Sequence, residues 1–408
     1  MRKLAALIFL ITSLSSFAEE DYLFIVDPYL TPIMGAEDII SIQQGLMRLE
    51  DRWTHPERAP RKTWGAGIGR FAEMLTVWDP INYTAMVTQH EVFGHTYRIL
   101  DVGQKYAKVR SIHIGVPPPY GPGGGATGYT LSTHASSTQN MAITMAGVEA
   151  TAIMATRLKL RWLKEWKISG RQTSLYTFTQ LDLTEYILSL DDSELFGVRE
   201  GHDIENYLEV LNGSFPSGHL SDGKLKAMSA VNLLDPFLYY SLYGWWRYVV
   251  TGKDMFIPMI PIGCVRYLPA GRLGLTPFGP EFFLENFLVA DGIPIYAYFK
   301  GGAFGENRYW GLGVEDQVVL QRDKYTLGFR VDLWLQPRLT IHQIPFLEFA
   351  SGSYADIPFQ PYRFGGALSL IGTYKMGFAQ LGYKSKGFLP GESLEPCPII
   401  RLGIQGQF

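Results

Sequence analysis

The last third of the chain alternates between apolar and polar residues, and this pattern restricts its fold more than any other feature. In residues 325–335 the odd-numbered positions, from Tyr325 to Leu335, are apolar, and the even-numbered positions are polar or small except for Trp334. Residues 400–408 repeat the alternation. Because successive side chains of a strand point to opposite faces, both segments predict β-strands with one apolar face.

Residues 254–408 resemble the β-barrels of bacterial outer membranes. The likeness rests on segments long enough to cross a bilayer as tilted strands, on aromatic residues towards their ends, and on the C-terminal aromatic residue Phe408. It implies an antiparallel barrel of about eight strands. Such a barrel would lie in outer-membrane lipid and be recognised by the outer-membrane assembly machinery. A soluble antiparallel structure with one buried face is the alternative.

The N-terminus predicts export. Residues 1–3 are basic, residues 4–14 are apolar, and residues 16–18 supply the small residues of a cleavage site. We therefore expect residues 1–18 to be a signal peptide and the mature protein to lie in the bacterial outer membrane. A retained N-terminal anchor is the alternative, although the apolar stretch is short for a bilayer span.

Residues 19–253 are expected to form a mainly helical, zincin-like domain. Asp79-Pro80 suits the first turn of a helix that runs to about Leu100, because the missing N–H of proline has no partner there. Alternation in residues 108–116 predicts a strand, and residues 139–167 predict a long helix. The expected fold class is α+β, with the helical domain followed by the β-barrel. A net charge of −3 argues against a nucleic-acid partner.

The segment from His90 to His95, His-Glu-Val-Phe-Gly-His, lies in the first of these helices and carries the strongest chemical signal. A catalytic zinc takes three protein ligands and a water, and a base must accept the proton of that water. In the common motif His-Glu-x-x-His both imidazoles share one helix face. Here one extra residue separates them, so the rings converge only if the helix loosens locally, as a π-bulge or at Gly94.

This six-residue form resembles the zinc motif of the dipeptidyl peptidase III family, which takes its third ligand, a glutamate, from a following helix. The matching residue is Glu149, 54 residues after His95. The resemblance implies that His90, His95 and Glu149 bind zinc and that Glu91 is the catalytic base. It covers only these two short motifs, and Asp182 is the alternative third ligand.

Other polar residues give weaker signals. His113, His134 and Tyr129 could donate a hydrogen bond to an oxyanion, although surface or loop positions are the simpler interpretation. His202-Asp203 precedes an expected helix and is interpreted as an N-cap pair. Residues 215–219 match the central motif of histidine-dependent lipid phosphatases, but the second histidine segment of that family is missing, so we interpret them as a loop.

Together these features predict an outer-membrane-anchored, zinc-dependent hydrolase. The most direct interpretation is a metallopeptidase that acts on a peptide or protein substrate, with Glu91 activating a zinc-bound water. The alternative is a non-enzymatic outer-membrane barrel protein whose helical domain binds metal or has a structural role. The two cysteines, Cys264 and Cys397, are too few for a cysteine-based zinc site.

Overall fold

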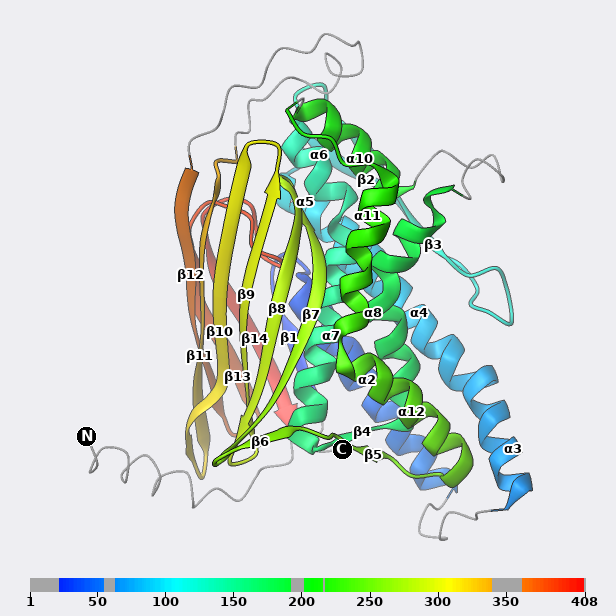
Figure 1. Ribbon diagram of the computed structural model, residues 1–408. Coiled ribbons are helices and arrows are strands. Elements are labelled where there is room, and N and C mark those ends of the chain that lie inside the picture. Colours follow the sequence, from blue (N-terminus) through cyan, green and yellow to red (C-terminus); the bar gives the residue numbers. More distant parts are fainter. Residues whose placement is uncertain (1–21, 55–62, 192–201, 216, 340–361, 407–408) are drawn as a thin grey trace.

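A large antiparallel sheet bends around a layer of helices (Figure 1). The computed structural model describes residues 22–54, 63–191, 202–215, 217–339 and 362–406. The expected signal peptide, residues 1–18, and the terminal Phe408 lie outside the described residues. Within the described part of the chain, no helix is long and apolar enough to cross a membrane.

The sheet has ten strands in the order β1-β14-β13-β12-β11-β10-β9-β8-β7-β6. Their bounds are β1 Tyr22–Val26, β6 Ile260–Ile262, β7 Val265–Thr276, β8 Gly279–Ala290, β9 Ile293–Phe304, β10 Asn307–Arg322, β11 Tyr325–Pro337, β12 Tyr362–Tyr374, β13 Gly377–Lys384 and β14 Cys397–Gly406. Two smaller sheets pair β2 Ala107–Ile114 with β3 Gly125–Leu131, and β4 Lys167–Ile168 with β5 Met255–Phe256.

The helical layer is built around α7, which contacts α2, α4, α8 and the sheet. The helices are α2 Pro32–Thr54, α3 Trp64–Glu73, α4 Asp79–His90, α5 Tyr97–Val102, α6 Ser137–Thr144, α7 Ala146–Glu165, α8 Thr173–Leu188, α10 Asp203–Ser214, α11 Asp222–Ser229 and α12 Pro236–Thr251. Two π-helical segments, η1 Met74–Trp78 and η2 Glu91–Thr96, flank α4, and 3₁₀ turns occupy η3 Gly170–Gln172, η4 Ser189–Asp191 and η5 Ala230–Leu234.

The expectation that residues 254–408 form a closed barrel of about eight strands is wrong. Among the described residues the sheet is open, with β1 at one end and β6 at the other. β1 comes from the start of the chain and pairs with β14, from Tyr22 opposite Gly406 to Val26 opposite Leu402. Near the two ends of the sheet, β1 packs on α2 and β7 packs on η5. Helices therefore occupy the space through which the ends would have to meet.

The helices and the sheet share their hydrophobic cores. One core joins Ile143 and Val148 of the helical layer to Leu273 of β7, and a second joins Trp162 of α7 to Phe287 of β8. The change from helices to strands near residue 254 is thus a change of secondary structure within a continuous packed body.

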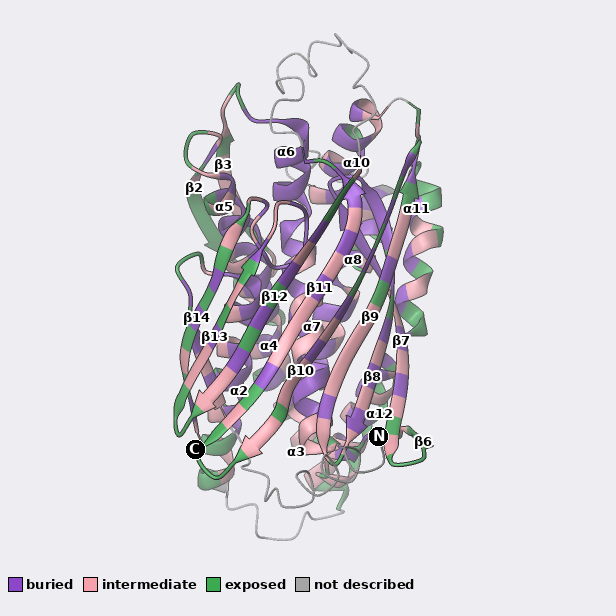
Figure 2. Cartoon of the chain, turned by 90° about the vertical axis from the view of Figure 1, so that its left-hand side faces the viewer, coloured by how far each residue is buried: buried purple, intermediate pink, exposed green. Residues whose placement is uncertain are grey.

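The alternation of the strands places apolar side chains on the face away from the helices, while the face against the helices mixes polar residues with apolar ones such as Phe287. Figure 2 shows how burial varies along the strands. In β12, Leu368 and Leu370 are 56% and 64% exposed, whereas Ser369 between them is 1% exposed. We call the surface that faces away from the helices the outer face; it includes Leu284, Phe299, Leu327, Leu368, Leu370 and Leu402. The predicted strands over residues 325–335 and 400–406, and their division into two faces, are confirmed.

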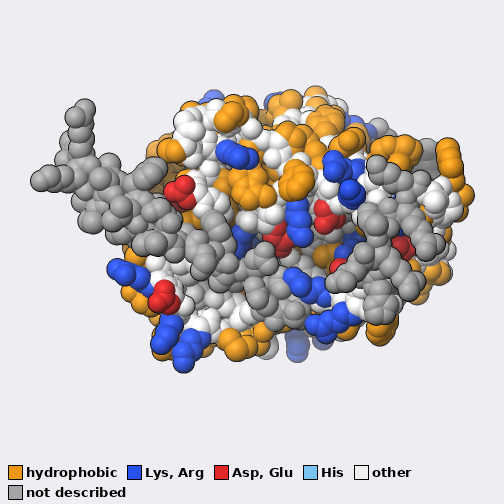
Figure 3. All heavy atoms as spheres, turned by 90° about the horizontal axis from the view of Figure 1, so that it is seen from below, with side chains coloured by type: hydrophobic (Ala, Val, Ile, Leu, Met, Phe, Trp, Pro, Cys, Tyr) orange, Lys and Arg blue, Asp and Glu red, His pale blue; other side chains and the backbone are white. Residues whose placement is uncertain are grey.

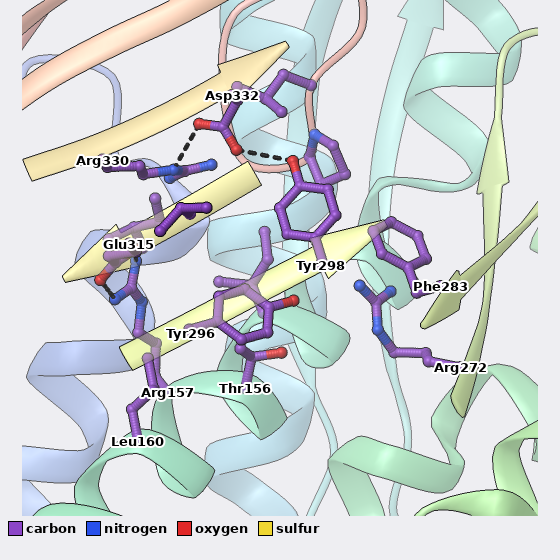
Figure 4. Close-up of a pocket in the computed structure, with 15 residues that line it drawn as sticks. Thr156, Arg157, Leu160, Arg272, Phe283, Tyr296, Tyr298, Glu315, Arg330 and Asp332 are labelled. Atoms are coloured by element: carbon purple, nitrogen blue, oxygen red, sulfur yellow. Dashed lines mark hydrogen bonds and ion pairs between the residues drawn. The ribbon is translucent and has the colours of Figure 1, made fainter. Parts of the chain in front are cut away.

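The interior between sheet and helices is ionic. Lys159 of α7 lies 2.7 Å from Asp235 and 2.8 Å from Glu285 of β8, and all three side chains are buried. Arg157 of α7 pairs with Glu315 of β10, and both side chains line a pocket between the helices and the sheet (Figure 4). Paired charges of opposite sign are the form in which ionisable groups are tolerated inside a protein.

Candidate metal centre

The helix that carries the histidine motif changes from α to π geometry within the motif. α4 ends at His90, and the π-helical segment η2 runs from Glu91 to Thr96 before α5 begins. A π-helical turn accommodates one more residue than an α-helical turn, so residues five apart come back to one face. The loosening that the spacing of His90 and His95 requires is therefore present.

Gly94 and Gly147 allow α7 to approach η2 closely. A Cβ atom on Gly94 would lie 2.7 Å from both the carbonyl oxygen of Ala146 and the Cα of Gly147. A Cβ atom on Gly147 would lie 2.1 Å from Nε2 of His90. Neither position has room for a side chain, and the missing side chains let the first turn of α7 form one wall of the site.

His90, His95 and Asp203 form a group that could hold a metal ion. The Nε2 atoms of the two histidines lie 3.1 Å apart, and Oδ2 of Asp203 lies 3.3 Å from that of His90 and 3.0 Å from that of His95. Ligand atoms around a tetrahedral zinc with bonds of about 2.0–2.1 Å lie about 3.3–3.4 Å apart. The three side-chain atoms therefore have the separation that a metal centre needs.

The other ring nitrogens of the two histidines are held by partners within the protein. Nδ1 of His90 lies 2.9 Å from Oδ2 of Asp182, which also accepts a hydrogen bond from Thr151. Nδ1 of His95 lies 2.8 Å from the carbonyl oxygen of Ile143. Because a carbonyl oxygen only accepts, His95 carries a proton on Nδ1, and its Nε2 faces the centre. The Asp182 carboxylate favours the same tautomer of His90, the arrangement usual for metal-bound histidines.

Charge within the group shifts the pKa values of its members. Burial by itself would lower the pKa of His90, but the carboxylates of Asp182 and Asp203 outweigh it, and the pKa lies well above the ordinary histidine value. Burial would also lower the pKa of His95, but the negative charge of Asp203 outweighs it, and the pKa is raised. Burial would raise the pKa of Asp203, but the two histidines lower it well below its ordinary value. The carboxylates beside the two histidines therefore favour a positive charge between the three side chains.

Glu91 lies beside the metal-ligating group rather than in it. Its carboxylate accepts a hydrogen bond of 2.7 Å from the Thr127 hydroxyl on β3. A Cβ atom on Gly125 at the start of β3 would lie 2.7 Å from the Cγ of Glu91, so the strand passes directly over this side chain. The hairpin of β2 and β3 thus fixes Glu91 next to His90 while leaving the coordinating atoms to other residues.

Glu149 is not brought to the two histidines. Its Oε1 accepts hydrogen bonds from Arg98 at 2.8 Å and from the backbone N–H of Gly391 at 2.7 Å. The glutamate implied by the resemblance to dipeptidyl peptidase III thus ties α7 to Arg98 and to the loop before β14. Asp182, the alternative third ligand, contacts His90 through Nδ1, on the side of the ring opposite to the convergent atoms.

The sequence interpretation did not include Asp203 as a ligand. It expected His202-Asp203 to cap a helix, and His202 does accept a hydrogen bond from the Glu205 backbone N–H at the start of α10. Since His202 supplies the cap, the Asp203 carboxylate is available to the two histidines. The signal was a carboxylate next to a residue that already supplies the one acceptor the cap needs.

Of the weaker candidates, Tyr129 lies near the group. Burial and the negative charge of Asp203 raise the pKa of Tyr129 to about 12, so its hydroxyl stays protonated and can donate. His113 and His134 are exposed, in agreement with the simpler interpretation of both. Comparison of the chain with known family models, with characterised proteins and with solved structures finds no match.

Proposed function

We propose that the protein is a zinc-dependent hydrolase whose metal is held by His90, His95 and Asp203. The observation that carries the proposal is the convergence of the two Nε2 atoms and the Asp203 Oδ2 within 3.0–3.3 Å of one another. Two imidazoles and one carboxylate are a usual donor set for catalytic zinc, which keeps a fourth position open for water or substrate. Such a set also suits non-haem Fe(II).

Glu91 favours hydrolysis over oxygen chemistry. Zinc, when bound, would polarise a substrate carbonyl and acidify water. The Glu91 carboxylate, held by Thr127, would take a proton from the attacking water and pass it to the leaving group. Asp182 would keep the His90 ring in position, and the protonated Tyr129 hydroxyl is a donor for charge that develops on the carbonyl oxygen.

The β2–β3 hairpin supports a peptide substrate. Among the described residues, β2 pairs only with β3, so its outer edge presents backbone groups to which an extended chain can bind. Both strands contact η2, which carries Glu91 and His95. An extended peptide added to this hairpin would therefore lie next to the proposed centre, and a metallopeptidase is the reaction class we favour.

The burial of the ligands is the observation that favours a structural metal instead. His90 and His95 are 3% and 4% exposed, and the Asp203 side chain is 18% exposed. A structural site closes all positions around its metal, whereas a catalytic site leaves one open.

Comparison of the full-length protein with its Glu91→Gln variant tests the proposal. We expect both to bind one equivalent of Zn²⁺ by elemental analysis, because Glu91 is not a ligand. We expect the parent alone to hydrolyse a peptide library, with a loss of about 10²- to 10⁴-fold in the variant. Metal binding without hydrolysis in the parent establishes a structural site. Hydrolysis that persists in the variant refutes the role of Glu91, and retention of Fe²⁺ in preference to Zn²⁺ refutes the assignment of zinc.

A further inference from the structure

We propose that the outer face of the sheet is covered by lipid acyl chains, so that the strands lie within a bilayer. The proposal is independent of the metal centre and of any hydrolytic activity. It rests on three features of the sheet: the side on which its apolar residues lie, their order along the strands, and the curvature of the surface they form.

The distribution of polarity across the sheet is the reverse of that in a sheet that covers helices in water. In β14, Leu402 on the outer face is 56% exposed, whereas Arg401 on the inner face is 2% exposed and pairs with Glu392 at 2.9 Å. A solvated antiparallel sheet buries its apolar face and presents its polar face to water. Here paired charges lie inside, beside apolar residues such as Phe287, and the outer face is apolar, so an apolar medium suits that face better than water.

The charged residues of the inner face form ion pairs with one another, and turning this face outward would break those pairs. Arg330 of β11 lies 2.8 Å from Asp332 and 3.3 Å from Glu392 (Figure 4). Lys300 of β9 lies 3.1 Å from Glu281 of β8. The outer face is thus the side of this sheet that is open to an apolar medium.

Residues on the outer face are ordered along the strands as in a bilayer. At one end Tyr325 of β11 lies opposite Tyr374 of β12. At the other end Leu335 lies between Trp310 and Phe364. Between these rows the outer face of β11 carries Leu327, Phe329, Val331 and Leu333. Aromatic side chains gather at the two surfaces of a membrane, and aliphatic ones lie between them.

The length of the strands agrees with this order. Tyr325 and Leu335 lie ten residues apart in the sequence, about 33 Å along a strand, which tilting reduces towards the roughly 25–30 Å of a hydrocarbon core. The strands are tilted in Figure 2. Charged residues flank the tyrosine row, in the turn Arg322–Lys324 and at Lys375. The view from below shows Lys and Arg side chains at this end, with hydrophobic side chains along much of the outline (Figure 3).

Curvature favours lipid over a second copy of the chain. The sheet bends around the helices, with β1 on α2 and β7 on η5, so the outer face is convex (Figure 1). Two convex surfaces touch along a narrow strip, which would leave most outer-face leucines in water. The helical side also exposes apolar residues, since Trp64 of α3 and Trp246 of α12 are 92% and 60% exposed. A fluid hydrocarbon phase reaches both sides of the molecule.

Quenching of a fluorescent label by brominated acyl chains tests the proposal. In full-length protein with Cys264→Ser and Cys397→Ser, one variant carries Leu370→Cys on the outer face. A control carries Lys105→Cys in the exposed turn between α5 and β2. Each is labelled with bimane and reconstituted into phosphatidylcholine vesicles with or without bromine on the chains. We expect the bromine to reduce emission by about half or more at residue 370, and to leave residue 105 unchanged.

Three outcomes would overturn the proposal. One is equal emission with and without bromine at residue 370 in vesicle-associated protein. Another is quenching of that label by aqueous iodide as strong as at residue 105. The third is a stable dimer in detergent-free buffer in which the residue-370 label is shielded from iodide, which would make the outer face an interface between copies. A second variant, labelled at Leu402→Cys, shows whether the result at residue 370 is only a local effect of that substitution.

Discussion

The Nε2 atoms of His90 and His95 lie 3.1 Å apart, although the residues are separated by five positions in the chain. Nδ1 of each ring is already engaged, with Asp182 and with the carbonyl oxygen of Ile143. The lone pairs of two nitrogen atoms at this distance repel each other unless a proton or a metal ion lies between them. The Asp203 carboxylate completes the set at 3.0 and 3.3 Å, and a divalent metal ion satisfies all three atoms at once.

Replacement of Asp203 should abolish metal binding. We expect Asp203→Asn to lose at least about 100-fold in Zn²⁺ affinity, because a neutral amide replaces the one anionic ligand. The control is Glu205→Gln, a carboxylate in the same first turn of α10 that is not part of the group. Competition with a zinc-binding dye measures both. Equal affinity of the two variants would contradict the assignment of Asp203.

Gly147→Ala should prevent metal binding although it replaces none of the three proposed ligands. Its Cβ would lie 2.1 Å from Nε2 of His90, where the coordinating lone pair points. Gly69→Ala in α3 is the matched control, because no heavy atom lies within 4 Å of its Cβ position. Elemental analysis should give no zinc in the first protein and one equivalent in the second. Zinc bound by both variants would mean that the ion lies away from His90 Nε2.

Asp182→Asn should weaken metal binding while preserving the site. The carboxylate holds His90 through Nδ1 and is itself held by Thr151. Loss of such an orienting partner costs about 10- to 100-fold in metal affinity. Isothermal titration with Zn²⁺ would measure the change, and a complete loss of binding would instead indicate that Asp182 is a direct ligand.

An arginine on the outer face should destabilise the protein according to its depth in the bilayer. We expect Leu370→Arg to reduce the free energy of unfolding in vesicles by about 2–4 kcal/mol, because a charge near the bilayer centre is poorly solvated. Met376→Arg, at the β12–β13 turn beside Lys375, should cost about 1 kcal/mol or less. Urea titration followed by tryptophan fluorescence compares them. Equal effects of the two substitutions would count against a lipid-covered face.

The sequence carried much of this architecture in its local patterns. Alternation predicted the strands over 325–335 and 400–406 and the two faces that they present. It could not predict an open sheet, because closure depends on how distant elements pack. β1 has only five residues, Tyr22–Val26, and its pairing with β14 spans nearly the whole chain.

One part of the candidate site could be predicted from local sequence, and another part depends on residues that are far apart in the chain. The His90–His95 spacing was sufficient to predict a distortion of the helix, which η2 supplies. The third member of the group lies 108 residues beyond His95, on a helix whose position depends on tertiary packing. Glu149 matched the spacing of the dipeptidyl peptidase III motif, but its carboxylate forms an ion pair with the buried Arg98.

The pairing of β1 with β14 has a consequence for the order in which the protein can form. β1 precedes the helices that the structure describes, and its hydrogen-bonding partner β14 follows the other described strands. β1 therefore has no strand partner until β14 has been synthesised, and the outer-face residues Ile400, Leu402 and Ile404 join the sheet only with that strand. Such sequence-distant pairing is slow and exposes strand edges while it is incomplete. The sheet can therefore be completed only after β14 has been synthesised.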